Sequence, residues 1–173
     1  MIDRLWSPWR LEYVTGSTST TGCVFCLAAD ASAKGADALR PPDTASLIVF
    51  EGKTCYIILN LYPYNNGHLM VVPYRHTGSL ASLTPDELQE MALLTQRSEA
   101  ALMEAYHPHG INVGMNLGKP AGAGVLDHVH MHLVPRWNGD TNFMTVVGEA
   151  RVLPEDLASG ASRLRPIFAK LGA

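Results

Sequence analysis

The 173-residue sequence contains little charge, few cysteines and no long apolar run. Charged residues make up 17% of it, and 13 Lys and Arg against 16 Asp and Glu give a net charge of −3. This balance, without a cluster of basic residues, argues against nucleic-acid binding, although backbone amides can still hold small anions. No run of 18 apolar residues or signal-peptide core is present, and three cysteines make a poor disulfide framework. We therefore expect a cytoplasmic protein that spans no membrane.

The length suits one domain with appendages. Residues 1–46 read as an N-terminal arm, whose second half, residues 28–46, is rich in Ala, Ser, Gly and Pro and predicts a mobile loop. Residues 47–145 carry most of the patterned segments and form the predicted core. Residues 146–173 are expected to form a C-terminal helical extension.

Alternating and apolar runs predict strands, and one strong capping signal predicts a helix. Thr84, Pro85 and Glu87 form a capping box that opens a helix running to about residue 106. A second helix is expected after Pro154, with Pro166 as a potential interruption. The strands are predicted at residues 47–50, 54–61, 68–73, 110–116, 128–134 and, as a short one, 143–147. Antiparallel hairpins with one long helix indicate an α+β fold.

Three histidines alternate with apolar residues in the segment that runs from His128 through His130 to His132. On a strand this spacing puts the three imidazoles on one face and the intervening Val and Met on the other. Imidazole titrates near neutral pH, binds metals and acts as a nucleophile, so a chemical site is the favoured interpretation. A surface histidine cluster and a pure metal site are the alternatives.

Several motifs together resemble the histidine triad (HIT) family of nucleotide hydrolases and transferases. His-x-His-x-His followed by two apolar residues is the first, and Gly67-His68 opening an apolar strand is the second. Asn112 to Gly118, followed by Gly122 to Gly124, resembles the nucleotide-binding strand and loop of the family. The resemblance covers roughly residues 47–145. It implies a five-stranded antiparallel sheet with one long helix and a C-terminal helix, and a dimer that joins two such sheets.

The resemblance also implies roles for four histidines. His130 would attack the α-phosphate of a nucleotide to form a nucleotidyl-histidine, while its other nitrogen bonds the backbone carbonyl of His128. His132 would contact the phosphate or the leaving-group oxygen. His68 would face the triad. A packed core histidine remains the alternative for His130, and a surface turn histidine the alternative for His68.

A loop and two asparagines are the predicted nucleotide-binding residues. Asn60 stands where relatives carry a residue that bonds the ribose hydroxyls, and Asn116 matches a phosphate or leaving-group contact. For both, turn capping is the alternative. Backbone amides near Gly122, Ala123 and Gly124 would cradle phosphate. Gly124 and Val125 occupy positions where hydrolase relatives place an amide and a hydroxyl side chain.

Cys23 and Cys26 have the spacing of metal ligands or of a redox pair. A redox role would want a thioredoxin-like βαβ context, which the sequence lacks. Some histidine triad relatives complete a zinc tetrahedron with a histidine after the Gly-His strand and with the first triad histidine. By that resemblance Cys23, Cys26, His76 and His128 form a structural zinc site. Cys55, within an apolar strand, is expected in the core.

The resemblance implies an enzyme acting on adenosine nucleotides or dinucleoside polyphosphates, closest to the bacterial diadenosine tetraphosphate phosphorylase (ATP adenylyltransferase) branch. Inorganic phosphate would then be the acceptor, with Lys119 and Arg136 as the nearest cations in sequence. The alternatives are a nucleoside phosphoramidate or dinucleoside polyphosphate hydrolase, and a non-catalytic purine-nucleotide binding module. A homodimer or a dimer of dimers is expected, partly because Trp6 and Trp9 need a partner surface.

Overall fold

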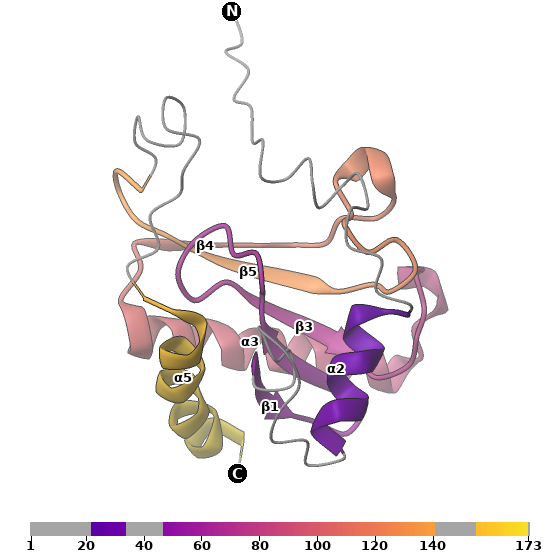
Figure 1. Ribbon diagram of the computed structural model, residues 1–173, viewed down its shortest axis with the longest axis horizontal. Helices are drawn as coiled ribbons and strands as arrows, with labels where there is room; N and C mark the ends of the chain where they lie inside the picture. Colours follow the sequence, from indigo (N-terminus) through magenta and orange to yellow (C-terminus); the bar gives the residue numbers. More distant parts are fainter. Residues whose placement is uncertain (1–21, 34–46, 141–154, 173) are drawn as a thin grey trace, which may run out of the picture.

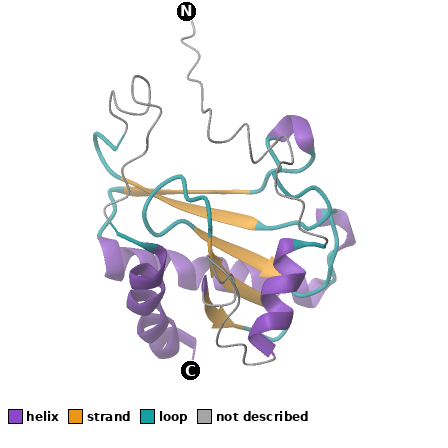
Figure 2. Cartoon of the chain, in the orientation of Figure 1, coloured by secondary structure: helices purple, strands orange, loops and turns teal. Residues whose placement is uncertain are grey.

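The computed structural model describes residues 22–33, 47–140 and 155–172, which form one five-stranded sheet with helices on both faces (Figures 1 and 2). The strands run in the order β1-β2-β3-β5-β4, and every neighbouring pair is antiparallel. This confirms the predicted α+β fold. The elements are α2 (Val24–Ala33), β1 (Ile48–Glu51), β2 (Cys55–Leu59), β3 (Leu69–Pro73), the 3-10 turn η2 (Leu80–Ser82), α3 (Pro85–Tyr106), β4 (Gly110–Gly114), the 3-10 turn η3 (Lys119–Ala121), β5 (Met131–Arg136) and α5 (Leu157–Gly172).

Two adjacent residues of β2 identify the helices on each face of the sheet. The thiol of Cys55, which is fully buried as predicted, contacts the carbonyl of Glu87 in α3. The hydroxyl of Tyr56 donates to the carbonyl of Phe25 in α2 at 2.8 Å. Because successive strand residues point to opposite faces, α3 and α2 cover opposite faces of the sheet. Helix α5 packs beside α3 and against β1 (Figure 1).

Helix α3 begins with the predicted capping box. Thr84 accepts from the backbone N–H of Glu87 at 3.2 Å, and the Glu87 carboxylate accepts from the N–H of Thr84 at 2.8 Å. The guanidinium of Arg75 also binds this carboxylate, and together these donors lower the pKa of Glu87 to about 2. The helix ends at Tyr106, where His107 takes a left-handed conformation before Pro108. The Arg75–Glu87 pair ties the segment after β3 to the start of α3.

The strand that carries the triad begins later than predicted. The first four predicted strands lie within two residues of those observed, whereas β5 starts at Met131 and not at His128. The carbonyl of Pro73 accepts a hydrogen bond from the ring of His128, and the carbonyl of His128 accepts one from the ring of His130, both at 2.8 Å. These two carbonyls therefore bond to side chains and not to the backbone of a neighbouring strand. The chain before Met131 therefore lies outside the strand ladder.

Two predictions about helices are corrected. Residues 28–33, expected within a mobile loop, form the second half of α2, because Ala28 is fully buried against the core and alanine favours helix. Pro166 lies inside α5 without ending it. The predicted loop over residues 34–46 and the predicted strand at 143–147 lie outside the described residues, as do the tryptophans of the arm. The division into arm, core and extension stays a prediction.

Within the described ranges, no helix combines the length and the apolar character needed to cross a membrane.

Candidate functional site

His130 lies just before β5 and is almost completely buried, with 6% of its surface exposed. Its Nδ1 is 2.8 Å from the carbonyl oxygen of His128, so Nδ1 carries the proton and donates it. Nε2 is then unprotonated, and no described residue hydrogen-bonds to it. Burial lowers the pKa of His130 below its usual value, which keeps the ring neutral at pH 7. The arrangement presents a neutral imidazole nitrogen with a lone pair.

The rings of His68 and His132 are hydrogen-bonded to each other, and a backbone N–H group determines the tautomer of each ring. The N–H of Tyr64 donates to Nδ1 of the fully buried His68 at 3.1 Å. Nε2 of a neutral His68 therefore carries its proton and donates to Nδ1 of His132 at 3.0 Å. A neutral His132 then carries its own proton on Nε2. His68 is thus a buried residue in contact with His132, and not the surface turn residue of the alternative interpretation.

His130 and His132 line a cavity of about 110 Å³ on the α2 side of the sheet. Its polar part also includes Asn60 and the backbone of Gly122 and Gly124. Its apolar part is lined by side chains from α2, the segment at the start of β1, β2 and β3, among them Phe25, Leu47, Ile58 and Met70. A cavity lined by both apolar and polar groups suits a ligand that has a flat apolar part and a charged part.

The glycine-rich loop reaches this cavity with two of its three predicted residues. Gly122 has φ of +92°, a conformation that side chains with a Cβ rarely adopt, and its carbonyl accepts from the amide of Asn116 at 3.4 Å. Ala123 is buried and does not line the cavity. Asn116 thus lies behind the loop, lining a neighbouring hollow.

Asn60 lies at the end of β2 with both ends of its amide engaged. Its carbonyl oxygen accepts from the N–H of Tyr62 at 3.0 Å, and its NH₂ group is 3.3 Å from Nδ1 of His68. Asn60 therefore does cap a turn, as the alternative interpretation expected, by accepting the hydrogen bond from Tyr62. The same contact holds the loop that leads to His68, while the residue still lines the cavity.

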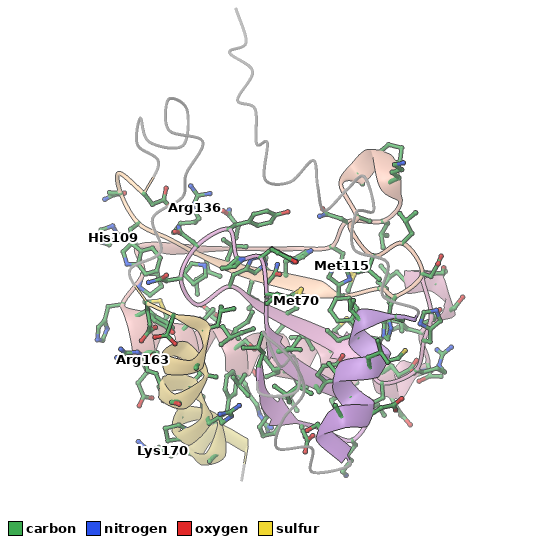
Figure 3. All side chains as sticks on the ribbon, in the orientation of Figure 1. Met70, His109, Met115, Arg136, Arg163 and Lys170 are labelled. Atoms are coloured by element: carbon green, nitrogen blue, oxygen red, sulfur yellow. The ribbon has the colours of Figure 1, made fainter. Side chains whose placement is uncertain are left out.

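A second hollow, about 350 Å³ in volume, lies on the other side of His132, toward β4. It extends between Arg136 at the end of β5 and Met115 just after β4, which lie at opposite ends of this strand pair (Figure 3). Arg136 binds both carboxylate oxygens of Asp140, at 2.6 and 2.8 Å. This predicted phosphate-binding cation is therefore already paired. Lys119 is exposed on η3.

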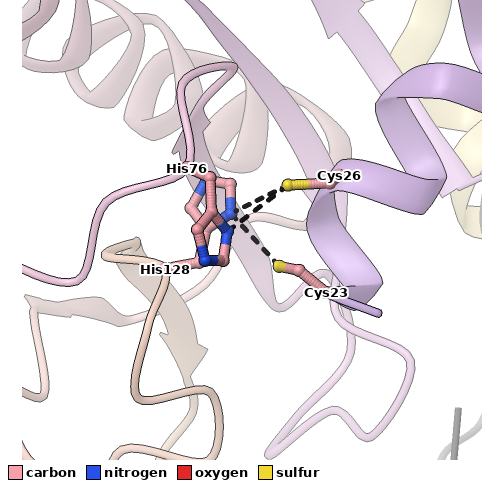
Figure 4. Close-up of side chains that lie close together, drawn as sticks. All are labelled: Cys23, Cys26, His76 and His128. Atoms are coloured by element: carbon pink, nitrogen blue, oxygen red, sulfur yellow. Dashed lines mark hydrogen bonds between the residues drawn. The ribbon is translucent and has the colours of Figure 1, made fainter. Parts of the chain in front are cut away.

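The four predicted metal ligands come together beside the cavity (Figure 4). Cys23 Sγ is 3.2 Å from His128 Nδ1, and Cys26 Sγ is 3.4 Å from His76 Nδ1 and 3.6 Å from His128 Nδ1. All four donor atoms lie within 4.8 Å of one another. Burial and the neighbouring Cys23 thiol raise the pKa of Cys26, so the thiolate form is disfavoured. A bound cation would stabilise the thiolate and so oppose this shift.

The donor set fits a tetrahedral ion. Bond lengths of about 2.3 Å to sulfur and about 2.1 Å to nitrogen at the tetrahedral angle separate a sulfur from a nitrogen by about 3.6 Å, close to the contacts found here. His128 donates Nε2–H to the carbonyl of Pro73 at 2.8 Å, so its Nδ1 lone pair faces the cysteines. His76 follows Arg75, which the Glu87 carboxylate holds. The cluster is therefore compatible with a metal site.

The sequence analysis missed the aromatic residues of the cavity. Phe25 lies between the two cysteines and lines the cavity, with its ring centroid 4.8 Å from that of His130. Tyr64 lines both hollows and stacks on His68 at 4.9 Å between centroids. Their neighbours carried the only available signal, since Phe25 stands inside the Cys-x-x-Cys motif and Tyr64 inside the tract that leads to Gly67-His68.

Comparison with known proteins gives consistent matches. The HIT domain family model matches residues 42–139. An AP-4-A phosphorylase of Mycobacterium tuberculosis is 40% identical over 158 residues, which are 89% of this chain and 78% of the relative. A bis(5'-adenosyl)-triphosphatase of Dictyostelium discoideum is 31% identical over 71% of this chain and 86% of its own length. A crystal structure of a Zn-bound histidine triad family protein from Mycobacterium smegmatis matches with a TM-score of 0.66 at 30% identity, covering 87% of this chain and 96% of that one.

Proposed function

The chain belongs to the HIT domain family, and on this premise we propose that it cleaves the α-phosphate link of diadenosine tetraphosphate and transfers the adenylyl group to inorganic phosphate. The observation that carries the proposal is the His130 geometry, in which Nδ1–H is fixed on a backbone carbonyl and Nε2 is left with a lone pair. The similarity to an AP-4-A phosphorylase over most of the chain supports this choice of substrate.

In the first step Nε2 of His130 attacks the α-phosphorus. A P–N bond forms, the bond from phosphorus to the bridging oxygen breaks, and ATP leaves. The ring becomes cationic while its nucleotidyl group is attached, and the hydrogen bond from Nδ1 to the His128 carbonyl stabilises that charge. A polyphosphate leaves as an anion at pH 7, so it needs a hydrogen-bond donor more than it needs a proton.

His132 is the proposed donor to the leaving group. It lines both hollows, and its contact with His68 assigns the proton of the neutral ring to Nε2. In the second step a phosphate oxygen attacks the same phosphorus, the P–N bond breaks, and the electron pair returns to Nε2 of His130. The products are ADP and ATP. The active site is then regenerated without a net proton change on either histidine.

The nucleotide-binding residues are proposed from their positions around the cavity. The backbone of Gly122, Ala123 and Gly124 would hold the phosphate beside His130. The side-chain oxygen of Asn60 already accepts a hydrogen bond from the N–H of Tyr62. With its second lone pair, the same oxygen would accept a hydrogen bond from a ribose hydroxyl. Asn116 would act on the phosphate through Gly122, whose carbonyl it binds.

The direct test is to incubate the protein with diadenosine tetraphosphate, with and without inorganic phosphate, and to separate the products. ADP together with ATP, formed only when phosphate is present, is the expected result. AMP together with ATP at the same rate in both samples identifies water as the acceptor and overturns the phosphorylase proposal.

A hydrolase is the second candidate function. The similarity to a bis(5'-adenosyl)-triphosphatase favours it, and so does the ion pair that occupies Arg136. Under this alternative water replaces phosphate in the second step, and the roles of His130 and His132 do not change. The non-catalytic binding module is disfavoured because a nucleophilic histidine would have no use there.

The metal that we propose for the Cys₂His₂ cluster is structural zinc. Four protein ligands close the coordination shell, so no open position is left for a water or a substrate. Zinc at this site would anchor α2 to the segments that carry His76 and His128. The Zn-bound histidine triad protein from Mycobacterium smegmatis supports the choice of ion. Metal analysis of carefully prepared protein tests it.

We also propose that the chain is a homodimer in the cytoplasm. Strand β4 is at the end of the sheet order and its residues are mostly exposed, including Val113 at 51%. An exposed strand at a sheet edge is a ready pairing surface. Light scattering at micromolar concentration tests the dimer, and a monomeric mass contradicts it.

A further inference from the structure

Gly67, the residue before His68, lies directly against helix α3. It is buried and has φ of +69°, and a Cβ placed there would lie 2.8 Å from the ring of Tyr106 and 3.1 Å from a methyl group of Leu102. A side chain does not fit within distances this short, so only glycine lets the turn approach α3 this closely. The ring of Tyr106 is therefore in direct contact with the backbone of the turn.

The same turn reaches the cavity through His68. Nε2 of His68 donates to Nδ1 of His132, which lines the cavity. This bond and the bond from the N–H of Tyr64 orient the imidazole of His68. They act on the ring, whereas the contact between Gly67 and Tyr106 supports the backbone that carries the ring.

Tyr106 is the last residue of α3 and is held in place by the C-terminal segment. Its hydroxyl donates to Oε2 of Glu155 at 2.8 Å. Oε1 of the same carboxylate accepts from Arg163 at 2.7 and 3.0 Å, and Figure 3 shows Arg163 on α5. The guanidinium carbon of Arg163 is also 5.7 Å from the centre of the Tyr106 ring. Burial and the Glu155 carboxylate raise the pKa of Tyr106, so its hydroxyl keeps the proton that it donates.

The packing between the C-terminal segment and the turn is almost complete. The hollow that His68, Tyr106 and Glu155 line has a volume of about 10 Å³, which is close to the space that one water molecule needs. Glu155 and Arg163 lie outside residues 42–139, which the HIT domain model matches. Residues outside the matched range therefore support Tyr106, and Tyr106 supports the turn.

We propose that Tyr106 is a positioning residue for the reaction, which acts on His132 through the turn that carries His68. This inference rests on the proposed function, in which His132 donates to the leaving group. Backbone bonds to Asn60 and Asn65 hold the turn within its own loop, and Tyr106 supports it from the side of α3. Without the ring the turn can move toward α3, which draws His68 away from His132. A misplacement of about 1 Å can cost roughly a hundredfold in rate, so even a smaller shift is measurable.

The first test compares two variants of Tyr106 by steady-state kinetics with diadenosine tetraphosphate and phosphate. Tyr106→Leu removes the ring beside Gly67 and should lower kcat by about five- to twentyfold, because the leaving-group donor is displaced. The KM for the dinucleotide should change by less than about twofold, since no group lining the cavity is altered. Tyr106→Phe keeps the ring and loses only the bond to Glu155, so it should recover most of the lost kcat.

The second test asks whether Tyr106 acts through His68. In the His68→Ala background, Tyr106→Leu should lower kcat by less than about twofold further, because the group that it positions is gone. A change that only reduces the fraction of folded enzyme would lower kcat by the same factor in both backgrounds. Gly67→Ala, whose added methyl would press against the same ring, is a second probe and should also lose its effect on kcat in the His68→Ala background.

Phe168→Leu is the matched control, because it trims another buried ring, which packs on Phe50 at the far end of α5. It should lower the melting temperature as Tyr106→Leu does and leave kcat unchanged. A wild-type kcat in folded Tyr106→Leu overturns the inference, and so do equal losses in the two backgrounds, while turnover by the wild type leaves the proposed function standing. If Tyr106→Leu does not fold, the same comparison with Gly67→Ala decides. Wild-type protein that does not cleave the dinucleotide overturns the proposed function, and the inference with it.

Discussion

His128 and His130 are two residues apart, both are buried, and both bind a backbone carbonyl, yet they belong to different sites. His128 donates through Nε2 to Pro73 and presents Nδ1 to the cysteines. His130 donates through Nδ1 to His128 and presents Nε2. The choice of ring nitrogen by the backbone therefore decides which nitrogen of each imidazole keeps its lone pair, and this difference underlies the proposed roles of metal ligand for His128 and nucleophile for His130.

The two sites also differ in how they are closed. Around His128 four side chains converge on one point, which leaves no place for a reactant. Around His130 one side is open to the cavity, and the pKa of the ring is lowered by burial without a second charged group. A mutation in one site should thus change stability and metal content, and a mutation in the other should change the rate.

His130→Ala has the largest expected effect, a loss of at least about a thousandfold in kcat, because it removes the covalent step. AMP affinity should stay within about tenfold, since the ring makes few ground-state contacts. The zinc content should not change. Steady-state kinetics, calorimetry and metal analysis check the three statements.

His109→Ala, a change of an exposed histidine outside the cavity, serves as the control for His130→Ala. Acid-labile radiolabelled AMP trapped on the wild type would identify the intermediate directly. Near-normal kcat in the variant contradicts the assignment of the nucleophile.

His68→Ala is expected to lower kcat by about ten- to a hundredfold, a typical effect of removing a group that orients a functional histidine. The change leaves Nδ1 of His132 without its buried donor. His68→Gln keeps an amide that donates and accepts, so it should recover part of the rate. Circular dichroism separates this effect from unfolding. If folded His68→Ala has the same kcat as the wild type, the hydrogen bond from His68 to His132 has no part in the mechanism.

His76→Ala should release zinc and lower the melting temperature by at least about 5 °C, because bound metal contributes directly to folding. The histidine is exposed, so little core packing is lost with it. Cys55→Ala is the control, since Cys55 is a buried cysteine outside the cluster and should keep the full zinc content.

Retained turnover at saturating dinucleotide in zinc-free, folded protein supports the structural role of the metal. A complete loss of kcat there assigns the ion a chemical role and breaks the division between the two sites.

Local pattern predicted the α+β fold, and the resemblance to the histidine triad family supplied the four members of the Cys₂His₂ cluster, which the structure brings together. The capping box at Thr84 and the strand periodicities are properties of neighbouring residues. The start of β5 could not be predicted, because it depends on carbonyls of Pro73 and His128 that bond ring N–H groups. Helix α2 was partly misread because an Ala-rich composition suits a helix as well as a loop once Ala28 is buried.

Phe25 and Tyr64 show what local pattern cannot supply. Tyr64 orients His68 through its backbone N–H. Every residue except proline has this group, so the residue type at position 64 does not predict the contact. Phe25 and His130 are 105 positions apart in the sequence, and they come into contact only because α2 packs on the sheet. The ion pair between Arg136 and Asp140 is by contrast local, since the two residues are four positions apart, and it changes the expectation for the acceptor.

The smallest expected effect concerns the phosphate acceptor and Arg136. Arg136→Ala should raise the KM for phosphate a few-fold, and more than the KM for the dinucleotide, if the second hollow receives the acceptor. The paired guanidinium is about half exposed, so its field is screened by water and the effect stays small. Lys119→Ala, which changes an exposed cation on η3, tests the other predicted residue.

Asp140→Asn sharpens this test, because it removes the charge that neutralises Arg136 while leaving an amide of similar size. The variant should lower the KM for phosphate, since a guanidinium without a carboxylate partner attracts anions more strongly. Initial rates at several phosphate and dinucleotide concentrations give both constants. Opposite shifts in Arg136→Ala and Asp140→Asn assign the second hollow to the acceptor. Identical phosphate constants in all three proteins exclude Arg136 from that role, and the acceptor must then meet the nucleotidyl-histidine from the side of the glycine-rich loop.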